Sequence, residues 1–173
     1  MRHFVAAVLV ALLSACATMP GPQTITLSTT EIEQQIRVDL GGVVAMFKGL
    51  DAPRPQVSLM PVSERLLLDW NFTLPDGPIG TPLGVVVELS GKPVLNAARN
   101  GIDLTQVRIE DVRLAGLPRF LSLARLIDQK GTTLPDLPLM TLPTDRLRQS
   151  DVAYVPTGVA VGFTGLKIDI VPR

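Results

Sequence analysis

Few residues of this 173-residue chain could do chemistry, and the two most reactive types both lie close to its start. Cys16 is the only thiol and His3 is the only imidazole. Zinc sites, Ser-His-Asp and Cys-His nucleophile systems and histidine acid-base catalysis all require one of these groups. Beyond Cys16, only carboxylate chemistry, Ser-Lys pairs or all-oxygen cation sites remain. No Ser-x-x-Lys, phosphate-loop, calcium-loop or dinucleotide motif is present, so we expect no cofactor and no metal.

The first residues are typical of a bacterial export signal. A cationic start at residues 1–3 precedes an apolar run at residues 4–13 (FVAAVLVALL), which is much shorter than the about 20 residues of a membrane span. The run closes on Leu13-Ser14-Ala15-Cys16, which resembles the lipobox of bacterial prolipoproteins. This resemblance implies a signal peptide at residues 1–15, cleavage after Ala15 and a lipid anchor on Cys16.

The alternative is an ordinary secretory signal in which Cys16 is incidental. A single cysteine excludes an intramolecular disulfide, and lipidation would remove an exposed thiol from an oxidising compartment. The lipobox implies a diacylglycerol on the thiol and a further acyl chain, such as palmitate, on the new amino group, and two or more chains anchor a protein stably. Ala17 rather than Asp after the cysteine implies the outer membrane, and we expect the domain to face the periplasm.

Composition predicts one domain behind a short tether. Residues 16–22 hold the lipidated cysteine and a Pro/Gly-rich tether, and residues 23–173 are enough to bury about 70% of the unfolded surface. The chain has 16 basic and 16 acidic residues without a basic run. Nucleic acid is therefore not an expected partner.

A strand followed by a helix is predicted at the start of the domain. Residues 23–27 (QTITL) alternate as a short strand, and Ser28-Thr29-Thr30-Glu31 matches a capping box. Ile32, Ile36 and Leu40 then repeat at helical spacing, and the pattern can resume after Gly41-Gly42 to reach Phe47. We therefore expect a long N-terminal helix with one apolar stripe.

From residue 56 the apolar period changes to two, which predicts half-buried antiparallel strands at residues 56–59, 66–74, 83–89 and 102–114. Asn100-Gly101 is a turn signal before the last of these. That strand slips phase at Thr105-Gln106 and at Glu110-Asp111, and an extra residue absorbed at each slip would form a β-bulge and bend the sheet. Short separate strands are the alternative interpretation.

The second half of the chain predicts a further helix at residues 117–129, with Pro118 in its first turn. Three prolines in residues 134–143 favour an extended covering segment over a helix or a central strand. Residues 159–170 read as either one bent strand or a tight hairpin. The expected fold class is therefore α+β: a highly curved antiparallel sheet around a long N-terminal helix, with a second, shorter helix.

The order of lipobox, tether, strand into capped helix, long strands, second helix and terminal strand after Val-Ala-Tyr-Val-Pro resembles the YceB-like lipoproteins of the DUF1439 family. That family is similar in fold to the tubular lipid-binding superfamily of bactericidal permeability-increasing proteins. The resemblance implies a helix lying in a curved sheet and a hydrophobic tunnel for lipid. Gly41-Gly42 and the proline-rich residues 134–143 depart from the family pattern.

The leading interpretation is a non-enzymatic module that binds a lipid or another hydrophobic molecule in a groove between the helix and the curved sheet. The residues expected to line this groove are apolar side chains of the helix stripe and of the inward strand face: Ile32, Ile36, Leu40, Phe47, Leu68, Trp70, Phe72, Val85, Val87, Val107 and Ile109. For each of them taken singly, ordinary core is the alternative and the commoner role.

Two other functions fit the sequence. An accessory lipoprotein with a filled core could bind another envelope protein through its surface. A carboxylate hydrolase could use Glu110, Asp111 or Asp69, although neighbours in a strand point to opposite faces unless a bulge intervenes. We expect no enzymatic activity and therefore no catalytic residue.

Overall fold

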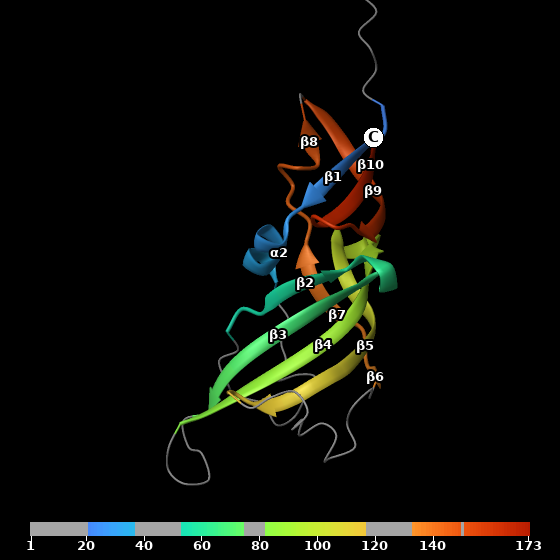
Figure 1. Cartoon of the computed structure of the whole chain (residues 1–173). Coiled ribbons are helices and arrows are strands. Elements are labelled where there is room, and N and C mark those ends of the chain that lie inside the picture. The colour runs from blue at the N-terminus through green and yellow to red at the C-terminus, as the bar shows by residue number, and fades with distance from the viewer. Residues whose placement is uncertain (1–20, 37–52, 75–81, 117–132, 150) are drawn as a thin grey trace, which may run out of the picture.

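The computed structural model describes residues 21–36, 53–74, 82–116, 133–149 and 151–173 (Figure 1). These ranges are mostly β-sheet and contain one α-helix. The elements are β1 (Gln23–Leu27), α2 (Thr29–Gln35), β2 (Gln56–Met60), η2 (Pro61–Ser63), β3 (Arg65–Leu74), β4 (Leu83–Asn96), η3 (Ala97–Arg99), β5 (Gly101–Leu114), β6 (Thr133–Leu134), β7 (Leu137–Thr141), β8 (Arg148–Gln149), β9 (Val152–Val161) and β10 (Leu166–Pro172).

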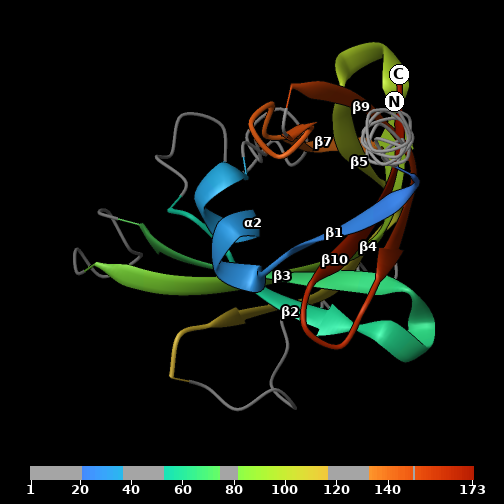
Figure 2. The same ribbon diagram turned by 90° about the horizontal axis from the view of Figure 1, so that it is seen from above.

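The strands form two antiparallel sheets where the sequence analysis expected one. The smaller sheet has the order β1-β10-β9-β8, and the larger has the order β2-β3-β4-β5-β6 with β7 also paired to β5. The larger sheet curls into a half-barrel, which the view from above shows (Figure 2). The expectation of a highly curved antiparallel sheet is therefore confirmed.

Both predicted phase slips in β5 are bulges. The β4–β5 register shifts once where Glu110 is the extra residue and again beside Gln106. Gln106 has a φ of 50°, a left-handed conformation that is uncommon outside glycine. Because each bulge absorbs an extra residue, Ile102, Val107 and Val112 are all buried on one side of the strand.

The concave face of the half-barrel is apolar along its length. Cross-strand register sets Trp70 opposite Val87, and Val87 opposite Val112. All three side chains are buried. Apolar residues paired directly across strands stabilise a sheet through their side-chain contacts.

The predicted capping box starts α2. Ser28 Oγ accepts from the amide of Glu31 (3.3 Å), and the Glu31 carboxylate accepts from the amide of Ser28 (2.9 Å). Ile32 is fully buried beneath the helix. Isolated helices shorter than about 12 residues are marginal in water, so α2 depends on this cap and on packing.

The long N-terminal helix expected from the Ile32, Ile36 and Leu40 spacing is not confirmed. The helix ends at Gln35, because Ile36 adopts φ −58° and ψ 131° and so leaves the helical conformation. Apolar spacing alone cannot forecast this end, since the partly buried Ile36 packs against the core from an extended backbone. Residues 37–52, with Leu40 and Phe47, lie outside the described ranges.

The helix lies across the open side of the half-barrel (Figure 2). It contacts both β2 and β7, which lie at opposite edges of the curled sheet. The amide of Val57 in β2 also donates to the Glu33 carboxylate (2.8 Å). The helix therefore bridges the two edges.

The remaining expectations concern the second half of the chain. Residues 159–170 form a hairpin between β9 and β10, so the hairpin alternative is right. The proline-rich segment is extended as predicted, and among the described strands its strand β7 pairs only with β5. The helix predicted at residues 117–129 lies entirely outside the described ranges.

Candidate functional site

The predicted lining residues come together in the interior of the half-barrel. All those that the structure describes join or pack against one hydrophobic cluster: Ile32, Ile36, Leu68, Trp70, Phe72, Val85, Val87, Val107 and Ile109. Trp70 is 1% exposed and Val107 is 0% exposed. The strands supply one face through the period of two, and α2 supplies Ile32 and Ile36 from the other side.

Most of the side chains that the structure describes in this interior are buried. None of the predicted lining residues borders the pockets found among the described residues. Beyond α2, the strands β3, β4 and β5 continue toward the end of the half-barrel where Leu74 and Leu83 lie (Figure 1). Phe72 and Val85 pair there, and the partly buried Leu114 lies opposite Val85.

The outer face of the same strands carries a network of polar side chains. Of its members, the sequence analysis named only Asp69, Glu110 and Asp111. The Arg65 guanidinium donates to Ser90 Oγ (2.7 and 3.0 Å), to the Ser90 carbonyl (3.0 Å) and to the Gln106 carbonyl (2.9 Å). Ser90 Oγ in turn donates to the Glu110 carboxylate. Burial, and then the nearby charge of Arg108, lowers the pKa of Arg65, but a guanidinium keeps its charge in proteins.

The bulge brings Glu110 and Asp111 to the same outer face, which a regular strand would not do. Asp111 lies opposite Glu88 in the register, and Arg113 contacts both carboxylates, at 3.1 Å and 3.0 Å. The Asp111 contact is an ion pair without the geometry of a hydrogen bond. Asp69 of β3 lies opposite Glu88 of β4 in the strand register. The carboxylates of Asp69, Glu88 and Asp111 therefore follow one another across three strands.

The polar side chains of this outer face contact one another, and several of them are buried. Ser90 is 1% exposed and Asp111 is 6% exposed. Within the described ranges, no group of three or more acidic, cysteine or histidine side chains could hold a metal ion. In the sequence, the two phase slips of residues 102–114 indicate this region. The contacts of Arg65, Ser90 and Arg113 could not be predicted, because they depend on cross-strand register.

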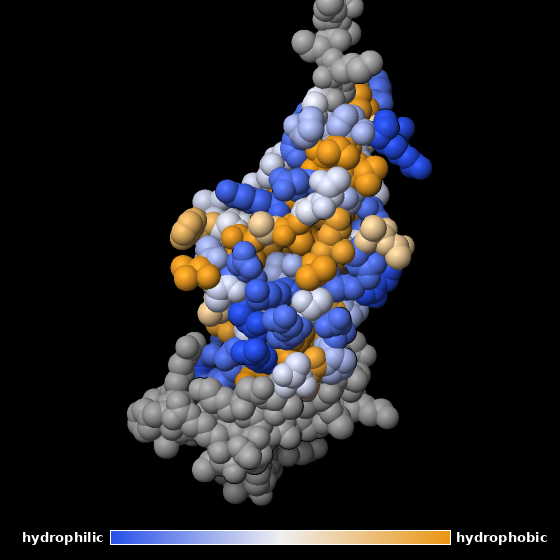
Figure 3. Space-filling model, turned by 90° about the vertical axis from the view of Figure 1, so that its right-hand side faces the viewer, coloured by the Kyte–Doolittle hydropathy of each residue, from blue (hydrophilic) through white to orange (hydrophobic). Residues whose placement is uncertain are grey.

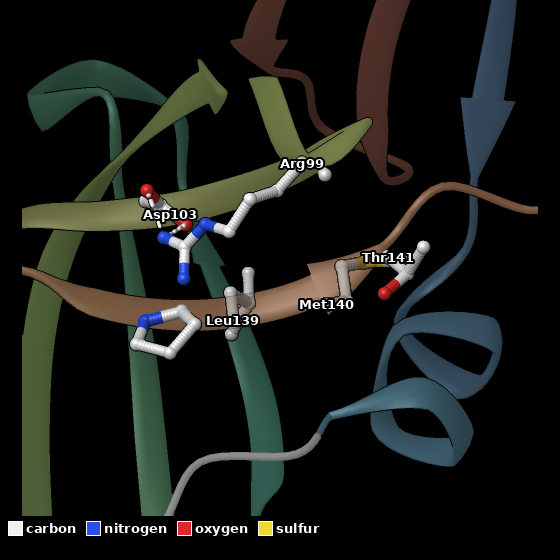
Figure 4. A pocket seen from close by; sticks show the side chains of 7 residues that line it. Arg99, Asp103, Leu139, Met140 and Thr141 are labelled. Carbon is white, nitrogen blue, oxygen red and sulfur yellow. Dashed lines mark hydrogen bonds and ion pairs between the residues drawn. The ribbon is translucent and has the colours of Figure 1, made fainter. Parts of the chain in front are cut away.

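A small cavity of about 110 Å³ lies between the η3 turn and β7 (Figure 4). Arg99 extends alongside β5 on one side of the cavity and donates to both carboxylate oxygens of Asp103 at 2.6 Å, and Asn96 donates to Asp103 as well. Leu139 and Met140 form the opposite wall. Typical ligand pockets occupy about 300–1,000 Å³, so this one suits only water or a very small molecule.

A larger groove of about 570 Å³ runs along the start of β9 and is called the Tyr154 groove here. It is bordered by Asn100, Leu147, Arg148, Tyr154, Val155 and Arg173, among others. Sequence reasoning did not single out these residues, because nothing in the local pattern places Arg148 and Arg173 together. The tertiary pairing of β9 with β8 and β10 does so.

The surface near β9 and β10 carries apolar side chains. On the side shown in Figure 3, hydrophobic residues gather across the upper half, and hydrophilic residues dominate below them. Phe163 in the β9–β10 turn is 85% exposed, and Val62 in η2 is 97% exposed.

The amino-terminal features cannot be placed in this fold, because residues 1–20, with Cys16, lie outside the described ranges. No helix within those ranges is long and apolar enough to cross a membrane. Comparisons of the chain with protein-family models, with curated proteins and with solved structures find no match. The resemblance to the YceB-like lipoproteins therefore rests on sequence pattern and element order.

Proposed function

We propose that this protein is a non-enzymatic envelope lipoprotein, anchored through Cys16 to the outer membrane, that binds a lipid or another hydrophobic molecule between α2 and the curved sheet. The observation that carries the proposal is a half-barrel with an apolar concave face whose two edges are bridged by α2. Such an arrangement joins an apolar lining to few polar groups, as small-molecule sites do.

The resemblance to the YceB-like family supports the same proposal. It implies a helix within a curved sheet and a hydrophobic tunnel. The second helix at residues 117–129 stays part of this proposal, as does the division into a signal peptide at residues 1–15, a tether at 16–22 and a single domain at 23–173. Phe72, Val85 and Leu114 are the side chains that we expect nearest to the ligand, because the strands that carry them run beyond α2.

Mass spectrometry of the wild-type chain and of a Cys16→Ala chain tests the anchor and the ligand together. We expect the intact mass of the wild type alone to carry acyl groups, and organic extracts of both proteins to contain a bound lipid. We also expect a fluorescent fatty acid to bind the Cys16→Ala chain. An extract without lipid together with no fatty-acid binding would contradict the ligand proposal, and an unmodified wild-type mass would contradict the anchor.

Two neighbouring substitutions locate the ligand. Val85 faces the concave side and Val86 the outer face, and both are buried. Val85→Met should reduce fatty-acid binding because it fills the groove, whereas Val86→Met should not. Overpacking costs about 1–3 kcal/mol at either position, so circular dichroism of both variants controls for folding.

The second candidate function is an accessory lipoprotein that binds another envelope protein through its surface. The exposure of Phe163 and Val62 favours it. Crosslinking in cells from a photoreactive residue at position 163 should then capture one reproducible protein. The same residue at position 97, an exposed site in η3, is the control.

A further inference from the structure

The two arginines of the Tyr154 groove lack carboxylate partners. Arg148 and Arg173 both border the groove and are exposed. Among the described residues, no carboxylate lies within ion-pair distance of either guanidinium. Asp145 and Asp151 are close in sequence to Arg148, but neither borders the groove. Within the described ranges, the groove therefore offers a ligand two guanidinium groups without an ion-pair partner.

Apolar and aromatic surface lies beside these cations. Leu147 and Tyr154 are buried under the groove, and Val155 is 40% exposed along it. The Tyr154 hydroxyl accepts a hydrogen bond from Gln23 Nε2 (2.9 Å), which fixes the ring. A groove that joins two guanidinium groups to an apolar floor matches a molecule with an anionic head and an aliphatic tail.

The volume of the groove fits such a molecule in part. About 570 Å³ lies within the range of about 300–1,000 Å³ that small-molecule sites occupy. It can hold a phosphate, its glycerol unit and the first carbons of an acyl chain. Arginine is well suited to this role, because its planar fork of donors matches the oxygens of a phosphate.

The groove also lies at the end of the fold where β1 begins. The ends of β8 and β10 lie beside it (Figure 1). Gln23 is only seven residues beyond Cys16. A fully extended tether of that length spans about 25 Å, so the proposed anchor would keep this end near the membrane surface. The location thus rests on the proposed anchor, but the chemistry of the groove does not.

We propose that the Tyr154 groove binds the phosphate of an anionic amphiphile between Arg148 and Arg173, with the start of the acyl chain along Tyr154 and Val155. This site is separate from the concave interior beneath α2. Phosphate supplied by a lipid and free inorganic phosphate share the chemistry recognised by the arginines. Only the lipid would use the apolar floor.

Calorimetric titration of the Cys16→Ala chain tests this proposal with three probes: dihexanoyl phosphatidylglycerol, dihexanoyl phosphatidylcholine and inorganic phosphate. We expect the phosphatidylglycerol to bind about tenfold more tightly than either of the others, and Arg148→Gln or Arg173→Gln to weaken its binding about tenfold, as loss of one charge-assisted pair does. Val155→Ser should weaken binding of the lipid but not of inorganic phosphate. Arg54→Gln, at an exposed arginine outside the groove, is the matched control.

Equal affinity for the two lipids would overturn the proposal, as would arginine variants that bind like the Arg54→Gln control. Inorganic phosphate binding as tightly as phosphatidylglycerol would overturn the amphiphile and leave a site for free phosphate. All variants carry Cys16→Ala, so any contribution from the amino-terminal segment is the same in each. Because Val85→Met acts only in the interior, failure here is distinguishable from failure of the proposed interior site.

Discussion

Glu31 connects two parts of the fold at the level of single side chains. Its carboxylate accepts from the amide and the hydroxyl of Ser28, and it also pairs with Arg146, which is far along the chain. These bonds from Ser28, and then the contact with Arg146, lower the pKa of Glu31 below its usual value of 4.5. The ionised carboxylate therefore stabilises both the start of α2 and the position of the 142–149 segment.

A pH-dependent contribution follows from the lowered pKa. Stability from Glu31 is present in full above the unfolded pKa of about 4.5 and is lost as the pH falls through the lower folded value. Glu31→Gln should reduce the free energy of unfolding by about 1 kcal/mol or less near neutral pH, because the side chain is partly exposed and the ion pair is screened. Urea unfolding near neutral pH and near about pH 3 should show the difference narrowing in acid. Glu64→Gln, at a carboxylate that is 75% exposed, should change little.

At the level of elements, the two bulges of β5 contribute to the curvature of the larger sheet. They keep Ile102, Val107 and Val112 on the concave side while the strand bends. The bulge beside Gln106 also points the Gln106 carbonyl at Arg65 of β3, on the other side of β4. A local irregularity in one strand thus contributes to a hydrogen bond across three strands.

The left-handed backbone of Gln106 gives a direct test of the bulge. Gln106→Val should lower the free energy of unfolding by about 1–3 kcal/mol, because a β-branched residue is strained at positive φ. Gln106→Gly should be tolerated or slightly stabilising, since glycine adopts this φ without strain. Thermal unfolding followed by circular dichroism measures both variants. Equal destabilisation by the two substitutions would show that the side chain, and not the backbone, accounts for the effect.

At the scale of the whole molecule, the described residues of both sheets share one core. Leu166 and Ile168 of the smaller sheet belong to the same hydrophobic cluster as Trp70 and Leu89 of the larger one. All of these residues are at most 1% exposed. A continuous core of this kind predicts that the two sheets unfold together.

Trp70, the only tryptophan, reports on this cooperativity from the larger sheet. Leu166→Ala in the smaller sheet should lower the urea midpoint of Trp70 fluorescence and of circular dichroism together, with a loss of about 2–5 kcal/mol. Val62→Ala, at a 97% exposed position, should move neither midpoint. A Trp70 transition that stays in place while the circular dichroism shifts would show that the sheets unfold independently.

Local sequence patterns predicted the elements that depend on short-range interactions. The capping box at Ser28 and Glu31 is a contact over three residues, and the alternation in residues 66–74 reflects one buried face. The phase slips in residues 102–114 located both bulges, because apolar residues must return to the same face. None of these features needs knowledge of distant residues.

Distant partners decide the features that the sequence could not provide. The end of α2 at Gln35 and the second sheet, in which β1 pairs with β10, both depend on chain segments that meet only in the folded state. The placement of Arg148 and Arg173 beside the same groove also depends on segments that are distant in the sequence.

The cysteine and histidine inventory is a property of the sequence by itself. With only His3 and Cys16, both close to the start, the sequence excludes the chemistry that requires imidazole or thiol from the rest of the chain. It also determines the period of each strand and the start of the helix, because these depend on neighbours along the chain. Only the tertiary structure decided which apolar residues share the concave face of the half-barrel and which charges lie unpaired beside a groove, because cross-strand register and sheet packing bring them together.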